Sequence, residues 1–416
     1  MKITLLTYGT RGDIQPFLAL AIGLQKAGHT VRLAAPECFA EFIDQHGVPF
    51  AGLAGDPKEI SASFNDAGTN MVRSARAISN HVFAIAQQVV RDAKVALASS
   101  DLVIHSFLFT TGGHTFARQL GIPDISVQTF PIFAPTRAFP NAAMANFPPG
   151  VLSYFSHWLV TQIFWHGGNS GFRRLRRQFP QDLPQELYWP FKQADDRPLS
   201  PLMFAISPTV LPRPEDWTAP HLHITGYFFL DESGYQPPAA LTDFLSAGGP
   251  PVGVSFGSMV NKNAERIGRA VLEALRRTRQ RGVILNGWGG WKPENIPDNV
   301  LFLESAPHNW LFPRCKVIIH HGGAGTTAAG LMSGNPNVVV PFAGDQPFWG
   351  KRVAALGAGP SPIPVKKLNA DSLTTALRLA DDDSMRRCAA HTGEKIRSED
   401  GVGTAVKLIE IWGTHL

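Results

Sequence analysis

The sequence predicts an α/β protein made of two doubly wound, Rossmann-like domains. A strand-helix-strand rhythm opens the chain, with strand character at Ile3–Tyr8, helix character at Gln15–Ala27 and a second strand at Thr30–Ala35. The rhythm restarts at Val252–Phe256, after a segment rich in proline and glycine. Such units have right-handed crossovers and build parallel sheets covered by helices. A chain of 416 residues is also too long for one ordinary core.

The pattern divides the chain into an N-terminal domain over 1–229, a linker over 230–251 and a C-terminal domain over 252–416. Pro237-Pro238 and Gly248-Gly249 mark the linker, with a short helix at Ala240–Ala247. The final helix, near Val402–Ile411, is allowed to pack back on the first domain. Further strands are expected at 102–105, 125–129, 203–207, 282–286, 300–304, 317–320 and 337–341, and helices at 265–278 and 326–333. Between 129 and 198 crowded aromatics with interspersed proline and glycine predict irregular loops and short helices.

Composition favours a globular, cytoplasmic protein. Hydrophobic residues make up 44% and charged residues 17% of the chain. The three cysteines, Cys38, Cys315 and Cys388, are odd in number and far apart, which excludes a readable disulfide framework and a CxxC metal site. The N-terminus reads as a first strand, not a signal peptide. The apolar stretch Val151–Trp165 is interrupted by polar residues and falls short of a membrane span.

The net charge of +5 indicates acidic partners. Two groups of arginines stand out, Arg173, Arg174, Arg176 and Arg177 in one and Arg276, Arg277, Arg279 and Arg281 in the other. Each group is read either as a contact for nucleic acid or an anionic membrane, or as a solvated helix face. We expect no nucleic-acid partner, and allow peripheral contact with a membrane.

The most informative stretch runs from His320 to Thr327, after an apolar strand and before a helix of small residues. Glycines let backbone amides approach an anion, and a helix start offers unpaired N–H groups and a positive dipole end. The carboxyl end of a parallel strand is where α/β folds bind nucleotides. We expect a diphosphate here, with His321 and Thr326 as further donors. The alternative is a tight strand-to-helix turn that needs small residues.

Asp345 and Gln346 end the next strand about twenty residues downstream. A carboxylate beside an amide offers the acceptors and donors that suit sugar hydroxyls. By themselves such residues are more often a helix cap.

Together these segments resemble the donor-binding signature of the UDP-glycosyltransferase superfamily with the GT-B fold. The similarity is carried by HHGGAGTTAAGL and VVVPFAGDQPFWGKRV, by the opening TYGTRGDIQPFLALAIGLQKAGHTVRLAAP, and by TGYFFL and VSFGS on either side of the linker. The branch that it resembles is that of the sterol 3-beta-glucosyltransferases and related bacterial natural-product glycosyltransferases. It covers about residues 3–36 and 225–368, while 56–200 matches loosely.

The resemblance implies two domains facing a cleft, with the nucleotide sugar held by the C-terminal domain. It implies diphosphate contacts from His321, Gly323, Gly325 and Thr326, with Ser258 lining the same site, and hexose contacts from Asp345 and Gln346. Ala306 and His308 match the segment that meets the base, and Trp288 would lie close to the nucleotide. Plant members carry a base-stacking Trp where this chain has Ser305, so UDP and dTDP both stay open.

In that branch the acid of the GTRGD loop takes the acceptor proton, and here it is Asp13. A carboxylate at hydrogen-bond distance removes the proton as the alcohol attacks the anomeric carbon. The alternatives are that Asp13 caps the following helix or pairs with Arg11. His105 is a candidate to support or replace it.

The implied reaction inverts the anomeric centre and uses no cofactor or metal beyond its co-substrate, UDP-glucose or a related nucleotide sugar. Asp381-Asp382-Asp383 superficially resembles a metal-binding motif, but we expect a solvated helix cap. A lipophilic acceptor such as a sterol, terpenoid, polyketide or phenol would be bound by aromatic residues, namely Phe64, Phe107, Phe109, Phe130 and Phe133.

Two other classes of function are alternatives to a glycosyltransferase. A nucleotide-sugar-binding protein without transfer activity would keep the loop at 321–326 and lack a usable base. An oxidoreductase is disfavoured, because Gly9-Thr10-Arg11-Gly12 is a poor dinucleotide fingerprint and no acidic residue ends the second strand.

Overall fold

The computed structural model describes residues 1–57, 71–190, 199–257, 264–287, 293 and 295–414. The chain forms two compact units. The first unit comprises Met1–Pro208, Pro212–Leu230 and Asp400–Leu416, and the second comprises Thr209–Leu211 and Asp231–Glu399. The last helix therefore belongs to the first unit, and nearly all of the segment expected as a linker belongs to the second.

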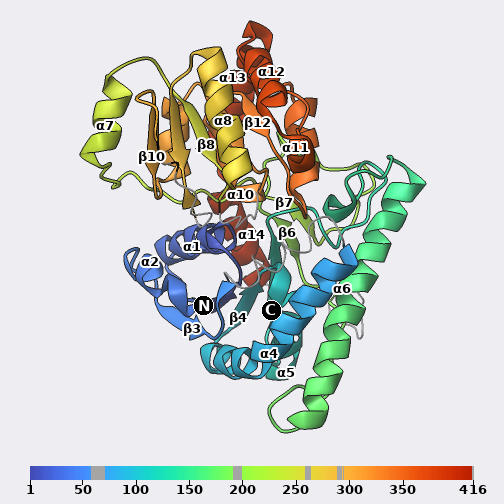
Figure 1. Ribbon diagram of the computed structural model, residues 1–416. Helices are drawn as coiled ribbons and strands as arrows, with labels where there is room; N and C mark the ends of the chain where they lie inside the picture. Colours follow the sequence, from blue (N-terminus) through green and yellow to red (C-terminus); the bar gives the residue numbers. More distant parts are fainter. Residues whose placement is uncertain (58–70, 191–198, 258–263, 288–292, 294, 415–416) are drawn as a thin grey trace. The chain divides into compact units, whose positions relative to one another are not determined.

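A parallel sheet of seven strands forms the first unit, in the order β3-β2-β1-β4-β5-β6-β7 (Figure 1). The order reverses between β1 and β4, as in doubly wound folds. The central strands β1, β4 and β5 are buried except at Lys2, and β4 is correspondingly apolar up to its last residue, His105. The strands are β1 (Lys2–Leu6), β2 (Thr30–Pro36), β3 (Phe50–Leu53), β4 (Leu102–His105), β5 (Asp124–Gln128), β6 (Leu202–Phe204) and β7 (Leu222–Ile224).

Helices flank this sheet, and α1 and α14 pack together over a shared core. Gly23 of α1 is tight against Val402 of α14, where a methyl group would lie 2.4 Å from Cγ1 of that valine. The helices are α1 (Arg11–Lys26), α2 (Ala40–Asp44), α4 (Met71–Leu97), α5 (Thr110–Leu120), α6 (Val151–Gln178) and α14 (Gly401–Thr414).

The expectation of irregular loops and short helices between 129 and 198 is wrong for much of that stretch. Residues 151–178 form the single long helix α6, which runs beside α4 (Figure 1). The loop before α6 supplies the reason, because it accepts and donates the hydrogen bonds of polar side chains on the inner face of the helix. Within the described residues, no helix has both the length and the apolar character required to cross a membrane.

The second unit has a parallel sheet of five strands in the order β10-β9-β8-β11-β12. Its order reverses between β8 and β11, at the same relative position as in the first unit. The strands are β8 (Val252–Ser255), β9 (Gly282–Leu285), β10 (Val300–Leu303), β11 (Val317–His320) and β12 (Asn337–Val339).

Amphipathic helices cover this second sheet. In α8 the buried residues recur at helical spacing, Ile267, Ala270, Val271, Ala274 and Leu275, and they join the core of the unit. The helices are α7 (Ala239–Ser246), α8 (Ala264–Thr278), α9 (His308–Leu311), α10 (Ala324–Met332), α11 (Gln346–Ala355), α12 (Ala370–Ala380) and α13 (Asp383–Arg397). The sequence therefore predicted the two-sheet α/β fold correctly.

Candidate functional site

The reversal point of the second sheet brings several of the predicted donor residues to one edge. In the register between β8 and β11, His320 lies opposite Ser255. The residues that follow them, Phe256-Gly257 and His321-Gly322, thus leave the same carboxyl edge on neighbouring strands. Ligands of open α/β sheets bind at this position.

The ring of His321 is held between two glycines. A methyl group on Gly323 would lie 2.5 Å from Nε2 of His321, and one on Gly257 would lie 2.9 Å from its Cε1. Only a residue without Cβ leaves room for the ring at these two places. Burial lowers the pKa of His321 to about 4, with a smaller opposing contribution from the Ser255 backbone. His321 is therefore a neutral imidazole at physiological pH.

His320 builds the turn and does not face the same space. It is fully buried, its Nε2 lies 3.1 Å from Oδ1 of Asn337, and its Nδ1 accepts from the Gly322 N–H at 3.1 Å. Burial lowers its pKa to about 3, so it too is neutral. His320 thus fixes the backbone of the turn, whereas His321 lies beside the start of α10.

Helix α10 begins directly after this turn, and its first turn is open. Gly323 is the N-cap residue and gives no side-chain cap, and the first intrahelical bond is that from Thr327 N–H to the Gly323 carbonyl, 2.8 Å. The amides of Ala324, Gly325 and Thr326 therefore have no acceptor within the helix. Gly325 is exposed and Thr326 is buried. This arrangement can bind an anion such as a phosphate.

Asp345 and Gln346 lie at the start of α11, and both make contacts within their own loop. Asp345 is the N-cap residue, and its Oδ2 accepts from Nε1 of Trp349 at 2.6 Å. The side-chain oxygen of Gln346 accepts from the N–H groups of Phe342 and Ala343, at 2.7 and 3.1 Å. Both side chains are thus held in fixed positions by the protein itself.

His308 lies at the start of α9, beside the end of β8. Its Nε2 is 2.9 Å from Oγ of Ser255, and its ring stacks on Phe312 with centroids 4.5 Å apart. Ala306 packs against an apolar cluster of the same unit. Ser258 and Trp288 lie outside the described residues, as does Phe64 of the expected acceptor pocket.

In the first unit, Asp13 closes the start of its own helix. Its Oδ2 accepts from the backbone N–H of Thr10 at 2.8 Å and from the Thr10 hydroxyl at 3.1 Å. A methyl group on Gly9 would lie 2.3 Å from the same oxygen. Burial raises the pKa of Asp13, and the two contacts from Thr10 lower it in part. Asp13 thus makes a capping contact at the start of its own helix, and its carboxylate of raised pKa lies at the reversal point of the first sheet.

His105 does not stand free at the end of β4. It is fully buried, and its Nε2 lies 2.8 Å from Oδ2 of Asp124. Asp124 also contacts Nδ1 of His114 at 3.0 Å and accepts from the Ser200 hydroxyl at 2.8 Å. These hydrogen bonds and the two imidazoles outweigh burial and hold the pKa of Asp124 well below its usual range. His105 is thus part of an interior polar cluster that joins β4, β5 and α5.

The aromatic residues expected to bind an acceptor divide into two groups. The Phe107 ring meets those of Phe130, Phe133 and Phe164, with centroids 5.1, 5.9 and 4.9 Å apart. These residues follow β4 and β5 or lie on α6, at the carboxyl edge of the sheet that also bears the Asp13 loop. Phe109 is different, because it is buried in an apolar core cluster of the unit.

The second arginine group is engaged on the surface of its own unit. Arg276 and Arg277 both pair with Glu273, and Arg277 also pairs with Asp371. Arg281 lies over the Phe244 ring, 4.1 Å from its centroid. These contacts fit the interpretation as a solvated helix face.

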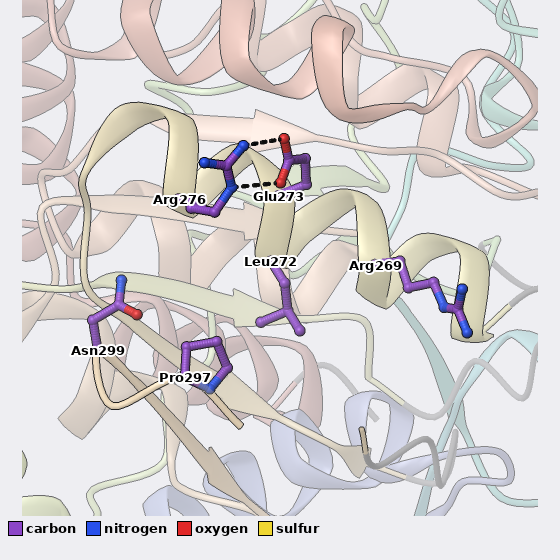
Figure 2. Close-up of a pocket in the computed structure, with 6 residues that line it drawn as sticks. All are labelled: Arg269, Leu272, Glu273, Arg276, Pro297 and Asn299. Carbon is purple, nitrogen blue, oxygen red and sulfur yellow. Dashed lines mark hydrogen bonds and ion pairs between the residues drawn. The ribbon is translucent and has the colours of Figure 1, made fainter. Parts of the chain in front are cut away.

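Figure 2 shows a pocket beside these arginines, with the two bonds between Arg276 and Glu273. It holds about 260 Å³ and is lined by Arg269, Leu272, Glu273, Arg276, Pro297 and Asn299. None of the expected donor residues lines it.

Two of the aspartates at 381–383 are helix caps, as predicted, and the third, Asp383, is the first residue of α13. Asp381 ends α12, and Asp382 begins α13, accepting from the backbone N–H groups of Ser384 and Met385. Across the described parts of the chain, no group of three or more His, Cys, Asp or Glu side chains is arranged to hold a metal ion.

Sequence reasoning missed the contacts that fix the site. Gly257 was available as a signal, because a glycine directly after a strand marks close approach by another group. The cluster of His105 and Asp124 carried no such signal, since its members come from separate elements, β4, β5 and α5, and meet only in the folded unit.

Two family models match the chain. The model for the glycosyltransferase family 28 N-terminal domain matches residues 3–139. The model for the C-terminal domain of erythromycin biosynthesis protein CIII-like proteins matches residues 286–406.

Curated relatives match almost the whole chain. Sterol 3-beta-glucosyltransferase UGT80A2 of Arabidopsis thaliana is 37% identical over 98% of this chain and 65% of its own length. The chain spans 33% of the sterol 3-beta-glucosyltransferase of Pichia angusta, at 36% identity over 98% of this chain. An O-mycaminosyltylonolide 6-deoxyallosyltransferase of Streptomyces fradiae is 34% identical, over 99% of this chain and 97% of its own length. The chain thus spans under two thirds of the two sterol glucosyltransferases and nearly all of the bacterial enzyme.

Solved structures share the fold at lower identity. The glycotransferase of kitacinnamycin superposes with a TM-score of 0.70 at 20% identity, covering 98% of both chains. The calicheamicin glycosyltransferase CalG4 also gives a TM-score of 0.70, at 20% identity, covering 99% of this chain and 98% of its own. With the relative of matching length and the paired Rossmann-like sheets, these similarities show that the chain belongs to the UDP-glycosyltransferase superfamily with the GT-B fold.

Proposed function

We propose that this protein transfers a hexose from a nucleotide diphosphate sugar to a hydroxyl group of a lipophilic acceptor. The observation that carries the proposal is the uncapped start of α10 beside the neutral ring of His321. Amides that lack an acceptor can bind the diphosphate and stabilise the charge that develops on it as it leaves.

In this proposal Asp13 is the general base. The acceptor oxygen attacks the anomeric carbon, the bond from that carbon to the diphosphate oxygen breaks, and the hydroxyl proton passes to Asp13. The raised pKa of Asp13 makes it a stronger base than an ordinary carboxylate. A single displacement inverts the anomeric centre, so an α-linked donor gives a β-linked product.

The donor is proposed to be UDP-glucose, with a dTDP-sugar as the second candidate. The sterol glucosyltransferase relatives are named for glucosyl transfer to sterols, and the Streptomyces fradiae relative for transfer of a deoxyhexose. One structural neighbour, the glycosyltransferase SsfS6, was solved with thymidine diphosphate. Plant members carry a Trp that stacks on the nucleobase where this chain has Ser305, so UDP- and dTDP-sugars are both candidate donors.

The acceptor class is proposed from the aromatic cluster around Phe107, which lies at the same edge of its sheet as the Asp13 loop. A sterol, terpenoid, polyketide or phenol has the apolar surface that such rings cover. Ser258, Gly323 and Gly325 are proposed to contact the diphosphate together with His321. Asp345 and Gln346 are proposed to bind the hexose, and Ala306, His308 and Trp288 to lie near the nucleotide.

We further propose that no metal takes part, because the helix start and His321 supply the stabilisation that a metal would supply. The test is release of nucleotide diphosphate from UDP- and dTDP-sugars with sterol and phenolic acceptors, with and without a chelator. We expect release that depends on the acceptor and persists with the chelator. Donor binding without release under any pairing would instead favour a binding protein without transfer activity.

A further inference from the structure

The first two turns of α6 expose a large apolar surface. Val151 is 73% exposed and Trp158 51%, and Leu152, Tyr154 and Phe155 between them are 45–50% exposed. The rings of Phe155 and Trp158 stack, with centroids 5.7 Å apart. At 100° per residue these five side chains fall on one continuous arc of the helix. A contiguous patch of this kind on a soluble surface marks an interaction site.

The opposite face of the same two turns is polar and fully buried. Ser153, Ser156 and His157 are each 0% exposed. The Ser156 hydroxyl accepts from the Asn141 N–H at 2.9 Å, and Nε2 of His157 lies 3.0 Å from the Phe139 carbonyl. The usual orientation is thus inverted: the loop before α6 satisfies the polar face, and the apolar face points outward. Rotating the helix would bury apolar area but break these hydrogen bonds, so the exposure is built into the fold.

The outward face continues as a basic one toward the end of the helix. Arg173 and Arg177 are exposed, while Leu175 between them is buried. The 28 residues of α6 span about 42 Å, so the apolar and basic ends are well separated along one helix. Among the described residues, none of the four arginines at 173–177 pairs with a carboxylate.

Only two of these arginines are available to a partner. Arg174 lies over the Phe83 ring, 4.9 Å from its centroid, and Arg176 donates to the Gln185 carbonyl. Arg173 donates to the nearby Asn169 side-chain oxygen at 3.4 Å, its one hydrogen bond within the described part of the chain. A contact between this arginine group and an acidic partner would therefore involve Arg173 and Arg177, and not all four arginines.

The net positive charge of the chain, +5, arises from this region. Residues 125–181 contain five of the 38 Lys and Arg residues and none of the 33 Asp and Glu residues. The remainder of the chain is therefore balanced in formal charge. The fifth arginine, Arg137, is exposed, and its carbonyl accepts from the Gly150 N–H at the start of α6, 2.8 Å. Asp216 is the acidic neighbour there, bound to the Arg137 N–H and the Thr136 hydroxyl.

We propose that the outward face of α6 docks the protein on an anionic membrane surface. The turns with Tyr154, Phe155 and Trp158 enter the boundary between headgroups and acyl chains, where Trp and Tyr are favoured. Arg137, Arg173 and Arg177 lie against lipid phosphates. Helices that lie in this plane combine an apolar face with arginines in the same way. Membrane docking is independent of sugar transfer, so each proposal can fail without the other.

The test is co-sedimentation with vesicles of phosphatidylcholine alone and of phosphatidylcholine mixed with phosphatidylglycerol. We expect the protein to bind both kinds, and the mixed vesicles more tightly. The double variant Phe155→Ser/Trp158→Ser should bind both kinds roughly tenfold more weakly, because it removes the inserted rings. The double variant Arg173→Gln/Arg177→Gln should lose roughly tenfold on mixed vesicles only, together with most of the salt dependence.

Matched controls lie on the second unit. Leu379, 51% exposed on α12, provides Leu379→Ser, and the exposed Arg378 and Arg387 provide a double change to Gln. These should bind vesicles as the unaltered protein does, and every variant should keep its thermal transition. Failure of the unaltered protein to bind mixed vesicles overturns the proposal. So does a protein that dimerises through this face, seen as a dimer in sedimentation that Phe155→Ser/Trp158→Ser converts to monomers.

Discussion

In each unit a helix begins at the reversal point of the sheet, and the two helix starts differ in whether a side chain caps them. In the first unit, α1 is closed by its own acid, because the Asp13 carboxylate accepts from the Thr10 N–H and hydroxyl. In the second unit, α10 begins at Gly323 without any side-chain cap. Helix α1 follows β1 and α10 follows β11, on opposite sides of the reversal in strand order, so the reversal point holds a carboxylate in one unit and unpaired amides in the other. In the proposed function, the carboxylate at the first helix start acts as the base, and the open start of the second helix binds the anion.

The closed start should carry the larger catalytic effect. Asp13→Asn keeps an oxygen that can accept from Thr10, but removes the basicity of the carboxylate. We expect turnover to fall about 10²- to 10⁴-fold. The binding constant for the nucleotide diphosphate, measured by calorimetry, should stay within a factor of two or so, since Asp13 has no part in binding it.

The variant His105→Gln tests whether His105 acts as the base or only stabilises the structure. Removing the imidazole from the cluster with Asp124 leaves a buried carboxylate short of one partner, which should lower stability by about 1–3 kcal/mol. Turnover at a temperature where the variant is folded should fall by less than about tenfold, well short of the general-base range. If His105→Gln abolished turnover and Asp13→Asn did not, the assignment of the base would pass to His105.

The open start should respond to a single methyl group. In Gly323→Ala the new Cβ lies 2.5 Å from Nε2 of His321, so the ring or the turn must move. We expect binding of the nucleotide diphosphate to weaken by roughly 10- to 100-fold, since misplacing one or two charge-assisted hydrogen bonds has this effect. Calorimetric titration with UDP and dTDP measures it directly.

Gly249→Ala is the matched control, because a methyl group there meets no atom within 4 Å. Its affinity for nucleotide should equal that of the unaltered protein. An equal affinity for Gly323→Ala would mean that the turn does not bind the diphosphate, and the proposed donor site would be wrong.

The contrast between the units was only partly predictable from sequence. β4 and β11 were predicted at their observed bounds, because short apolar runs bounded by polar residues are clear signals. The glycine-rich turn at 320–325 was recognisable from its place between strand and helix. The contacts of His321 with Gly257, and of His105 with Asp124, depend on strand pairing across many residues, which local pattern does not report.

Helix α6 shows why a strong element can escape local reading. In its first two turns the apolar residues point outward, and the inward residues are Ser153, Ser156 and His157. The expected rule, with apolar residues toward the core, therefore gives the wrong face. Aromatic and β-branched residues, with Gly167, Gly168 and Gly171, also lower its intrinsic helix propensity. The loop that satisfies the polar face decides the structure, and only tertiary contacts show it.

Acid should weaken the protein through histidines that are buried in the neutral form. The pKa values of His320 and His321 fall from 6.5 to about 3 and about 4. The unfolded chain therefore binds more protons than the folded one as pH drops from 6.5 toward 4, and stability falls over that range. Each histidine contributes on the order of 3 kcal/mol to the loss. Urea unfolding at a series of pH values measures it.

His320→Asn removes one of the two groups that take up a proton on unfolding. The free energy of unfolding should therefore depend less on pH between 6.5 and 4. Added nucleotide diphosphate should weaken this pH dependence further, since a phosphate beside His321 favours the protonated ring. A slope that neither change affects would show that these rings are already hydrated in the folded protein.

The smallest effect is expected on α8, where neither a base nor an anion site is proposed. Arg276→Ala removes the pair with Glu273 shown in Figure 2. Both side chains are solvated, and such pairs contribute little, so we expect the thermal transition to stay almost unchanged. Donor affinity should not change, because the pocket at Arg276 contains none of the residues proposed to bind the donor. A marked loss of nucleotide affinity in Arg276→Ala would relocate the anion site from the uncapped helix start to this arginine group, and the contrast between the two helix starts would no longer explain function.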